Sequence, residues 1–198
     1  MPTITQPDSP TLTTNRLQLS RLTTAVAADL LSYRSLPAVT QYQDWEPKTL
    51  QDAHDFINSL ATIPFNTPDT WFQFGLQLTQ TGQLIGDLGV HFPAEQAAQA
   101  ELGITIAPTY QRQGFAREAL LAVMGYLFET EGVAKHRLYA SVDPENIASR
   151  SLLQAVGMRQ EAHFRQSLWF KGAWVDDVIF AMLRSEWLTS SQPPPQTP

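Results

Sequence analysis

The polar loop at residues 111–116 has the residue types of a phosphate-binding site. It follows an extended apolar run at 102–107 and precedes a helix-like run that begins at Arg117. Because the start of a helix has unpaired backbone N–H groups and the positive end of the helix dipole, an anion is a good partner there. Gly114 lets a ligand approach the backbone, and Arg112 and Arg117 add positive charge. The loop favours a bound phosphate, although a simple strand-to-helix turn with a capping glycine would have the same residues.

The loop differs from the common nucleotide-binding loops. No Lys-Ser or Lys-Thr pair follows its glycine, and the Gly-x-Gly-x-x-Gly spacing is missing too. The four histidines lack the spacing of a zinc site, so a metal is not expected. The chain has no cysteine, which excludes disulfides, thiolate metal sites and a cysteine nucleophile.

The composition is that of one globular domain. Of the 198 residues, 43% are hydrophobic and 16% are charged. The net charge of -6 disfavours a nucleic-acid partner, which needs a basic face, and is compatible with a cationic substrate. No apolar run is long enough to span a membrane and no signal-peptide pattern occurs, so we expect a cytoplasmic protein without a membrane partner.

Hydrophobic periodicity predicts the elements that must hold the loop in place. Their order, β-α-α-β-β-β-α-β-α-β-β, predicts one mixed sheet covered by helices. The expected strands lie at 16–22, 71–78, 84–92, 101–107, 136–142, 159–170 and 174–183. The expected helices lie at 25–34, 50–60, 117–130 and 147–156, and Pro37 is expected to end the first of them or to open a loop.

Several segments together resemble the GNAT N-acetyltransferases, and among them the RimJ/RimL type, which modifies protein N-termini. Each motif alone is weak, but their order and spacing are fairly specific, and the resemblance covers roughly residues 11–187. The motifs are the opening strand at 14–19, Leu84-Ile85-Gly86, Glu101-Leu102-Gly103-Ile104 with the Gln/Arg-x-x-Gly-x-Gly/Ala loop at 111–116, Asn146-Ile147-Ala148-Ser149 with Leu153 and Gly157, and the late hairpin at 171–176.

The resemblance implies a fold of the α/β (α+β) class in a single GNAT-like domain at 11–187. Its central sheet is mixed and mostly antiparallel, with about seven strands, splayed between strands 4 and 5 and flanked by about four helices. Residues 1–10 are expected to be a flexible tail, and the Pro/Ser-rich residues 188–198 a disordered one.

The resemblance also implies acetyl-CoA as cosubstrate, without a metal. The loop would hold the pyrophosphate, and the strand before it would pair with the pantetheine arm. Asn146 has a donor and an acceptor for the amides of that arm, although it could equally cap the helix that follows. The implied cofactor-binding residues are Ile104, Ile106, Gln111, Arg112, Gln113, Gly114, Phe115, Ala116, Arg117 and Asn146.

Two catalytic residues are implied in the same way. Glu101 is the expected general base, directly or through water, with Asp87 as the alternative. Many relatives have a tyrosine where this chain has Leu153, so Ser149 is the expected replacement near the sulfur of the leaving thiolate. Three alternatives stay open for this role, namely Tyr110, Tyr139 and no general acid at all. His91 is expected to be an ordinary surface histidine, with a place in the lining of the acceptor cleft as the alternative.

The implied reaction is transfer of an acetyl group from acetyl-CoA to a primary amine, by direct attack in a ternary complex. The expected acceptor is the N-terminal α-amine of a protein or peptide. A small amine (polyamine, aminoglycoside or amino acid) and a non-catalytic CoA-binding module are the alternatives. Acceptor specificity is expected to reside in residues 33–48, where Tyr42 and Trp45 would wall the site, in loop 93–100 and in the late hairpin. The oligomeric state, including a homodimer, stays open.

Overall fold

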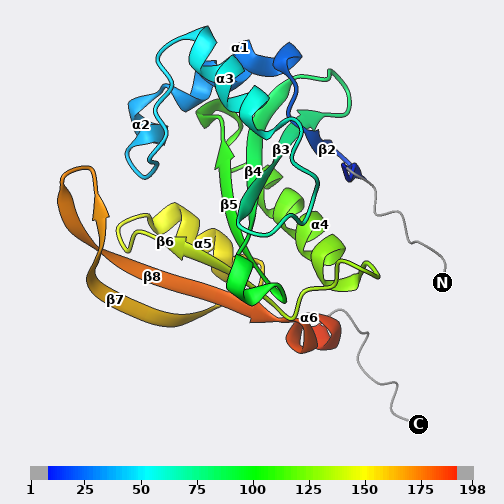
Figure 1. The fold of residues 1–198 in the computed structure, drawn as a ribbon, viewed down its shortest axis with the longest axis vertical. Coiled ribbons are helices and arrows are strands. Elements are labelled where there is room, and N and C mark those ends of the chain that lie inside the picture. Colours follow the sequence, from blue (N-terminus) through cyan, green and yellow to red (C-terminus); the bar gives the residue numbers. More distant parts are fainter. Residues whose placement is uncertain (1–8, 191–198) are drawn as a thin grey trace.

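The central sheet orders its eight strands as β1-β2-β3-β4-β5-β6-β8-β7 in the computed structural model, which describes residues 9–190 (Figure 1). Neighbouring strands are antiparallel except β5 and β6, which are parallel. The strands are β1 (Leu12–Thr13), β2 (Leu17–Arg21), β3 (Thr70–Leu78), β4 (Leu84–Phe92), β5 (Gln99–Ile106), β6 (Arg137–Val142), β7 (Arg159–Phe170) and β8 (Ala173–Leu183). The expected class is confirmed, with one strand more because the two-residue β1 pairs with β2.

Six α-helices occur in the described residues, two more than expected. They are α1 (Ala27–Arg34), α2 (Pro37–Thr40), α3 (Leu50–Leu60), α4 (Phe115–Glu129), α5 (Ile147–Ala155) and α6 (Arg184–Ser190), and the 3-10 turns are η1 (Thr24–Val26), η2 (Ala94–Gln96) and η3 (Pro108–Tyr110). Pro37 begins α2, where its fixed φ suits a first helical residue. Helix α6 extends to Ser190, past the expected domain end, and residues 1–8 and 191–198 lie outside the description.

Local sequence explains why α3 forms where the periodicity predicts it. Thr49 accepts a hydrogen bond from the N–H of Asp52, and the Asp52 carboxylate accepts one from the N–H of Thr49, which together form a capping box. Ala53 and Ile57 form the buried face of the helix and pack with Leu30 of α1 in a small core cluster. The pair of helices α1 and α3 therefore covers one face of the sheet near its centre.

The larger core lies on the other face of the sheet, under α4. Leu102 and Ile106 of β5 pack there with Leu120 and Val123 of α4. Because side chains alternate along a strand, Glu101, Gly103 and Thr105 point to the face that α1 and α3 share. β5 therefore separates a dry core from a face with polar residues.

The pairing of β5 with β6 ends before either strand does. Their register contains only Gln99 with Arg137, Ala100 with Leu138 and Glu101 with Tyr139. β5 continues to Ile106 and β6 to Val142, and the two strands diverge (Figure 1). The expected splay between the fourth and fifth predicted strands is therefore present, at β5 and β6 in the structure.

Candidate active site

The splay leaves main-chain groups of β5 without a strand partner on one side. The N–H of Ala107 donates to the carbonyl of Ile85 at 2.8 Å, which fixes the alternation of the ladder with β4. Ile104 and Ile106 therefore direct their main-chain groups away from β4, toward the gap. The carbonyl of Ile106 accepts a hydrogen bond of 3.0 Å from Nε2 of Gln111, so the open edge of β5 leads directly into the polar loop.

The polar loop presents a run of backbone N–H groups. The N–H groups of residues 112–117 donate no hydrogen bond to any part of the chain that the structure describes. Gly114 is the N-cap of α4 with φ 81°, and Arg112 also has a positive φ, 58°. Glycine adopts this region without strain, and the left-handed turn exposes the N–H groups that precede the helix. The loop can therefore accept an anion by backbone contacts alone.

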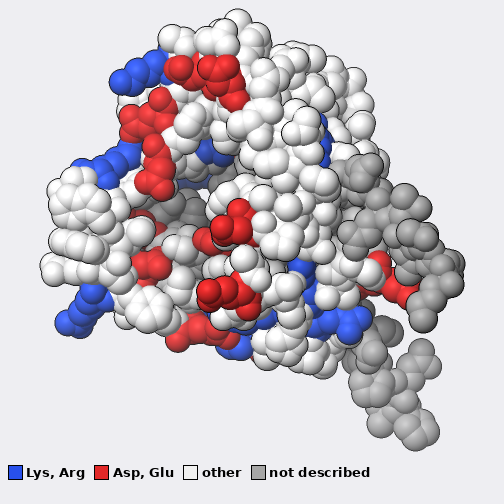
Figure 2. Space-filling model, in the orientation of Figure 1, with Lys and Arg blue, Asp and Glu red and all other residues white. Residues whose placement is uncertain are grey.

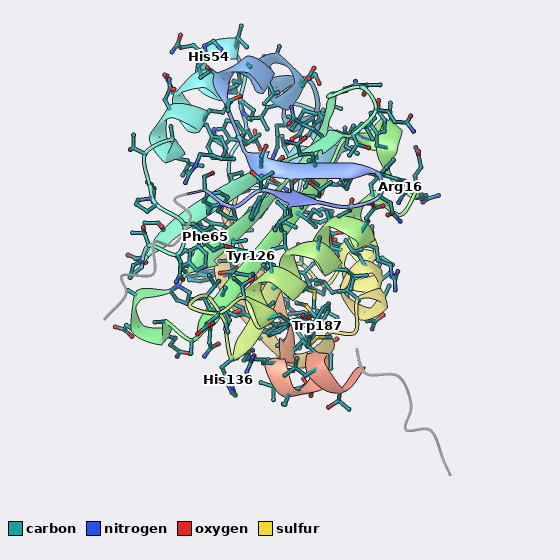
Figure 3. The ribbon with its side chains drawn as sticks, turned by 90° about the vertical axis from the view of Figure 1, so that its right-hand side faces the viewer. Arg16, His54, Phe65, Tyr126, His136 and Trp187 are labelled. Carbon is teal, nitrogen blue, oxygen red and sulfur yellow. The ribbon has the colours of Figure 1, made fainter. Side chains whose placement is uncertain are left out.

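Side chains fix the conformation of this loop. Nε2 of Gln113 donates to the carbonyl of Thr109 at 2.8 Å, and the carbonyl of Gln113 accepts from Nη1 of Arg16 at 3.0 Å. Arg16, from the start of β2, also pairs with Glu118 at 2.6 Å, and its guanidinium lies 4.3 Å from the ring centroid of Phe115 (Figure 3). Arg16 was not among the residues expected at the loop, because it comes from a distant strand.

The two arginines expected at the loop differ in their contacts. Arg112 is exposed and makes no hydrogen bond or ion pair to the described residues, so its charge is available to a ligand. Nε of Arg117 donates to the carbonyl of Ala155 at 3.3 Å, at the last turn of α5. The positive charge of Arg117 is therefore partly directed to the end of α5.

A cavity of about 560 Å³ lies where β5 and β6 diverge, and Figure 2 shows it as a hollow bordered by acidic side chains. Five carboxylates line it, and Arg34 is the one Lys or Arg among its described lining residues. The carboxylates belong to Asp44, Glu101, Asp143, Asp176 and Asp177. Asn146 and Ser149 line the cavity as well, whereas none of residues 111–117 does. The cavity therefore favours a cation and adjoins the gap rather than the anion-binding loop.

Glu101 occupies the vertex of the splay. It is the last β5 residue that pairs with β6, and the registers align Trp71, His91, Glu101 and Tyr139 in one row across β3 to β6. Burial raises the pKa of Glu101 and Asp177 raises it further, while His91 and a hydrogen bond from Tyr139 act in the opposite direction. A carboxylate with a raised pKa is a stronger base than an exposed one, which suits proton removal from an amine.

Comparison with known proteins identifies the family. The family model of the acetyltransferase (GNAT) domain matches residues 16–159. The chain belongs to the GNAT acetyltransferases. It is 30% identical over 176 residues to the uncharacterised N-acetyltransferase YoaA of Bacillus subtilis (strain 168), covering 88% of this chain and 97% of that protein.

One further relative links this GNAT acetyltransferase to the RimJ/RimL-like branch, and a solved structure shares its family and fold. Over 124 residues it is 29% identical to the ribosomal protein uS5-alanine N-acetyltransferase of Escherichia coli (strain K12), covering 62% of this chain and 63% of that one. The crystal structure of an acetyltransferase (GNAT family) from Bacillus anthracis matches with a TM-score of 0.79 and 25% identity, over 89% of this chain and all of that one. The expected family and enzyme class are confirmed.

Asp87, the alternative base, is not available to a substrate of this acetyltransferase. Its side chain is fully buried, and Tyr33 donates to it at 2.5 Å. Nε of Arg34 donates at 3.0 Å, and further hydrogen bonds come from Nη2 of Arg34 and Nε2 of Gln73. All its lone-pair directions are occupied by protein donors, so the interpretation of Asp87 as a base is wrong and its role is structural.

The start of α5 presents two expected residues to the cavity. Oδ1 of Asn146 accepts a hydrogen bond from the N–H of Ser149 at 3.1 Å, so Asn146 caps the helix. Its amide nitrogen has no partner among the described residues and can still serve a ligand. Leu153 is buried and lines the cavity, as does Ser149. Tyr110 does not line it, since its hydroxyl donates to Gln83 at 2.8 Å.

Residues from both ends of the chain wall the cavity. Tyr42 and Trp45 line it as expected, and Trp45 stacks on Phe56 with 4.3 Å between ring centroids. Leu168 and Phe170 line it from the β7–β8 hairpin. Residues of loop 93–100 line a second hollow instead. Segments 42–45 and 168–177 therefore wall this cavity from two sides, and loop 93–100 takes no part in it.

The histidines form no metal site in the described part of the chain. His54 on α3 and His136 before β6 lie at opposite ends of the molecule (Figure 3). His163 pairs with Asp176 at 2.7 Å, while His91 lies between two carboxylates in the Glu101 row. No helix among the described residues is long and apolar enough to cross a membrane.

Proposed function

We propose that this GNAT acetyltransferase transfers the acetyl group of acetyl-CoA to the N-terminal α-amine of a protein or peptide, by direct attack in a ternary complex. The observation that carries the proposal is the run of N–H groups at residues 112–117 without partners in the described chain. They directly follow the unpaired edge of β5. Together they match a ligand with a diphosphate at one end and an amide-containing arm at the other.

The chain's own residues fit acetyl-CoA at this place. N–H groups of residues 112–117 and the side chain of Arg112 would hold the diphosphate, and each hydrogen bond to a charged acceptor contributes about 1.5–3 kcal/mol. The carbonyl of Ile104 and the N–H of Ile106 would pair with the amides of the arm. The amide nitrogen of Asn146 would add a donor from the opposite side of the gap.

Acetyl-CoA supplies the acetyl group as a thioester. Glu101 would take the proton of the attacking amine, because its raised pKa makes it a competent base. An α-amine has a pKa of about 7.7–8.0 and a lysine about 10.4, so an N-terminal acceptor requires less of this base. The N–H of Ile104 is available as a donor to a developing oxyanion, and the hydroxyl of Ser149 is available to the leaving thiolate.

Two observations support an N-terminal amine as acceptor. A relative of this chain is named for acetylating the alanine of ribosomal protein uS5. The carboxylates that line the cavity favour a protonated amine before it reacts. The cavity of about 560 Å³ is large enough for the first residues of a peptide.

The test combines binding and turnover. Isothermal titration should give micromolar binding of acetyl-CoA, and thiol release should follow when N-terminal peptides are added. Since the chain has no cysteine, every thiol detected comes from the cosubstrate. A parallel panel of polyamines, aminoglycosides and amino acids separates the small-amine alternative. Binding without thiol release from any acceptor would indicate a binding module, and absence of CoA binding would refute the proposal.

A further inference from the structure

His91 of β4 connects the vertex carboxylate Glu101 to an exposed one. Nδ1 of His91 lies 3.7 Å from Oε2 of Glu101, and Nε2 lies 3.8 Å from Oδ1 of Asp69. His91 and Glu101 are direct cross-strand neighbours in the β4–β5 register. The two ring nitrogens therefore face two different carboxylates.

The imidazole of His91 is held in a fixed orientation. Its ring stacks on Trp71 with 5.1 Å between centroids and 25° between planes. Trp71 is itself packed over Gly89, where an added Cβ would lie 2.9 Å from the indole. Nδ1 of His91 is buried and has no hydrogen-bond partner among the described residues. A fixed ring with an unsatisfied buried nitrogen beside a carboxylate is unusual, because burial normally requires a partner.

The three groups lead from the cavity to an exposed carboxylate. Glu101 lines the cavity and its side chain is 24% exposed, and the side chain of His91 is 21% exposed. The side chain of Asp69 is 81% exposed and lines a second hollow of about 660 Å³. His91 lines neither space, so it stands in the wall between them.

Several charged and titratable groups surround this row. Asp69 and Glu101 face His91, and Tyr139 and Asp177 act on Glu101 from β6 and β8. Arg137 acts on Tyr139 and pairs with Glu161 at 2.7 Å. Lys135 donates to Asn66 and to the carbonyl of Ala97, each at 2.6 Å.

From this geometry we infer that His91 is a positioning residue for Glu101 that also carries its proton to Asp69 and solvent. The inference rests on the proposed function, in which Glu101 is the base. The amine nitrogen loses a proton to Glu101, Nδ1 of His91 takes that proton, and Nε2 releases one to Asp69 or water. The ring then regains its first tautomer by exchange with water, so one proton moves from the amine to solvent and nothing is oxidised.

The distances require a small adjustment for each transfer. Both separations exceed a direct hydrogen bond, so each step needs one bridging water or a small side-chain movement. The result of the relay is that Glu101 is ionised again before the next amine binds. Without the relay, the half-buried carboxyl would return its proton through the cavity that the substrates occupy.

The experiment removes the ring and replaces it from solution. In His91→Ala, kcat should fall about tenfold while the KM of the acceptor and the Kd of CoA stay unchanged. Added imidazole should restore most of the loss in a saturable way, since the space beside Trp71 accepts the ring. Ligand-observed NMR should detect imidazole on this variant and not on the wild type. His54→Ala, on a distant helix, is the matched control. Its kcat should equal that of the wild type and should not change when imidazole is added.

Other variants separate a relay from simple packing. His91→Phe keeps a ring on Trp71 without nitrogens, so it should be as slow as His91→Ala. The relay would be overturned if His91→Phe kept the wild-type kcat. It would also be overturned if added imidazole did not restore the kcat of His91→Ala. In Glu101→Gln, kcat should fall about 100-fold or more, and added imidazole should not restore it. If the wild type and Glu101→Gln release thiol at similar rates, Glu101 is not the base and the relay is overturned. If the wild type itself releases no thiol, the proposed function is overturned.

Discussion

Glu101, the proposed base, lies at the vertex of the splay. The carboxyl is at the last paired position of β5, where the strand is still fixed and the cavity already begins. Its pKa is raised by burial and by Asp177, a charged neighbour on β8. Position and proton affinity are therefore set by different parts of the chain.

The pH dependence of turnover follows from this raised pKa. Glu101 acts as a base only when ionised, so kcat should fall as the pH drops through a value above the usual carboxyl pKa of about 4.3. Asp177→Asn removes one of the charges that raise the pKa of Glu101, so the acid limb of the pH–rate profile should move to lower pH. Ser141→Ala removes the 2.7 Å hydrogen bond to Asp177 but keeps its charge, and is the control. An acid limb that stays in place in Asp177→Asn would contradict Glu101 as the titrating group.

Gly114 allows a second test at a single residue. In Gly114→Glu, a carboxylate enters the loop with the unpaired N–H groups, and CoA affinity should fall by at least about tenfold. The substitution also strains a backbone with φ 81°, at a cost of about 1 kcal/mol. Gly82→Glu is the matched control, because φ is 72° and nothing lies within 4 Å of an added Cβ. Equal CoA affinity in the two variants would refute the placement of the diphosphate.

At the scale of elements, a buried polar network attaches α1 to the sheet. Asp87 of β4 receives hydrogen bonds from Tyr33 and Arg34 at the end of α1, and from Gln73 of β3. Burial raises the pKa of Tyr33, and the Asp87 carboxylate raises it further. Burial lowers the pKa of Arg34, but the Asp87 carboxylate raises it, and the net shift is upward. The network fixes α1, and the chain that follows its C-terminal end leads into the cavity wall at residues 42–45.

Breaking this network should be costly. Arg34→Met leaves the buried Asp87 carboxylate without its cation and should lower the free energy of unfolding by about 3–5 kcal/mol. The matched control is Arg159→Met, which removes exposed pairs with Glu161 and Glu186 and should leave the urea midpoint nearly unchanged. Similar midpoints for the two variants would show that the buried pair adds little to the stability.

At the scale of the whole molecule, the β7–β8 hairpin extends toward α2 and closes one side of the cavity (Figure 1). At its tip, Nζ of Lys171 donates to the carbonyl of Thr40 at 2.9 Å and pairs with Glu46. The contact joins segments 131 and 125 residues apart in the chain. It holds the hairpin against the segment that walls the other side of the cavity.

Removing this contact should affect the acceptor alone. In Lys171→Ala, the KM of a peptide acceptor should increase several-fold, because the hairpin is no longer held against residues 40–46. The Kd of CoA and the melting temperature should change little, since an exposed ion pair contributes below about 1 kcal/mol. Lys48→Ala changes the charge equally in the same region and serves as the control. An equal increase of KM in both variants would indicate a general charge effect.

The sequence by itself determined the features that depend on neighbours along the chain. Period-two and helical patterns gave the strands and long helices, because each face needs only a local alternation of apolar residues. Thr49 and Asp52 begin α3, and Gly114 begins α4, through hydrogen bonds and backbone angles within a few residues. The position of the polar loop between β5 and α4 could be predicted for the same reason, whereas its binding of an anion stays a prediction.

The tertiary structure alone decided which distant residues meet. Trp71, His91, Glu101 and Tyr139 form a row only through strand register, which a pattern of period two leaves open because shifts by two residues keep every face. Asp87, a candidate base from the sequence, is fully buried in the folded chain and has a structural role. His91 likewise lies between two carboxylates only because the chain is folded. Long-range pairing sets register and burial, and these in turn set the proton affinities on which catalysis depends.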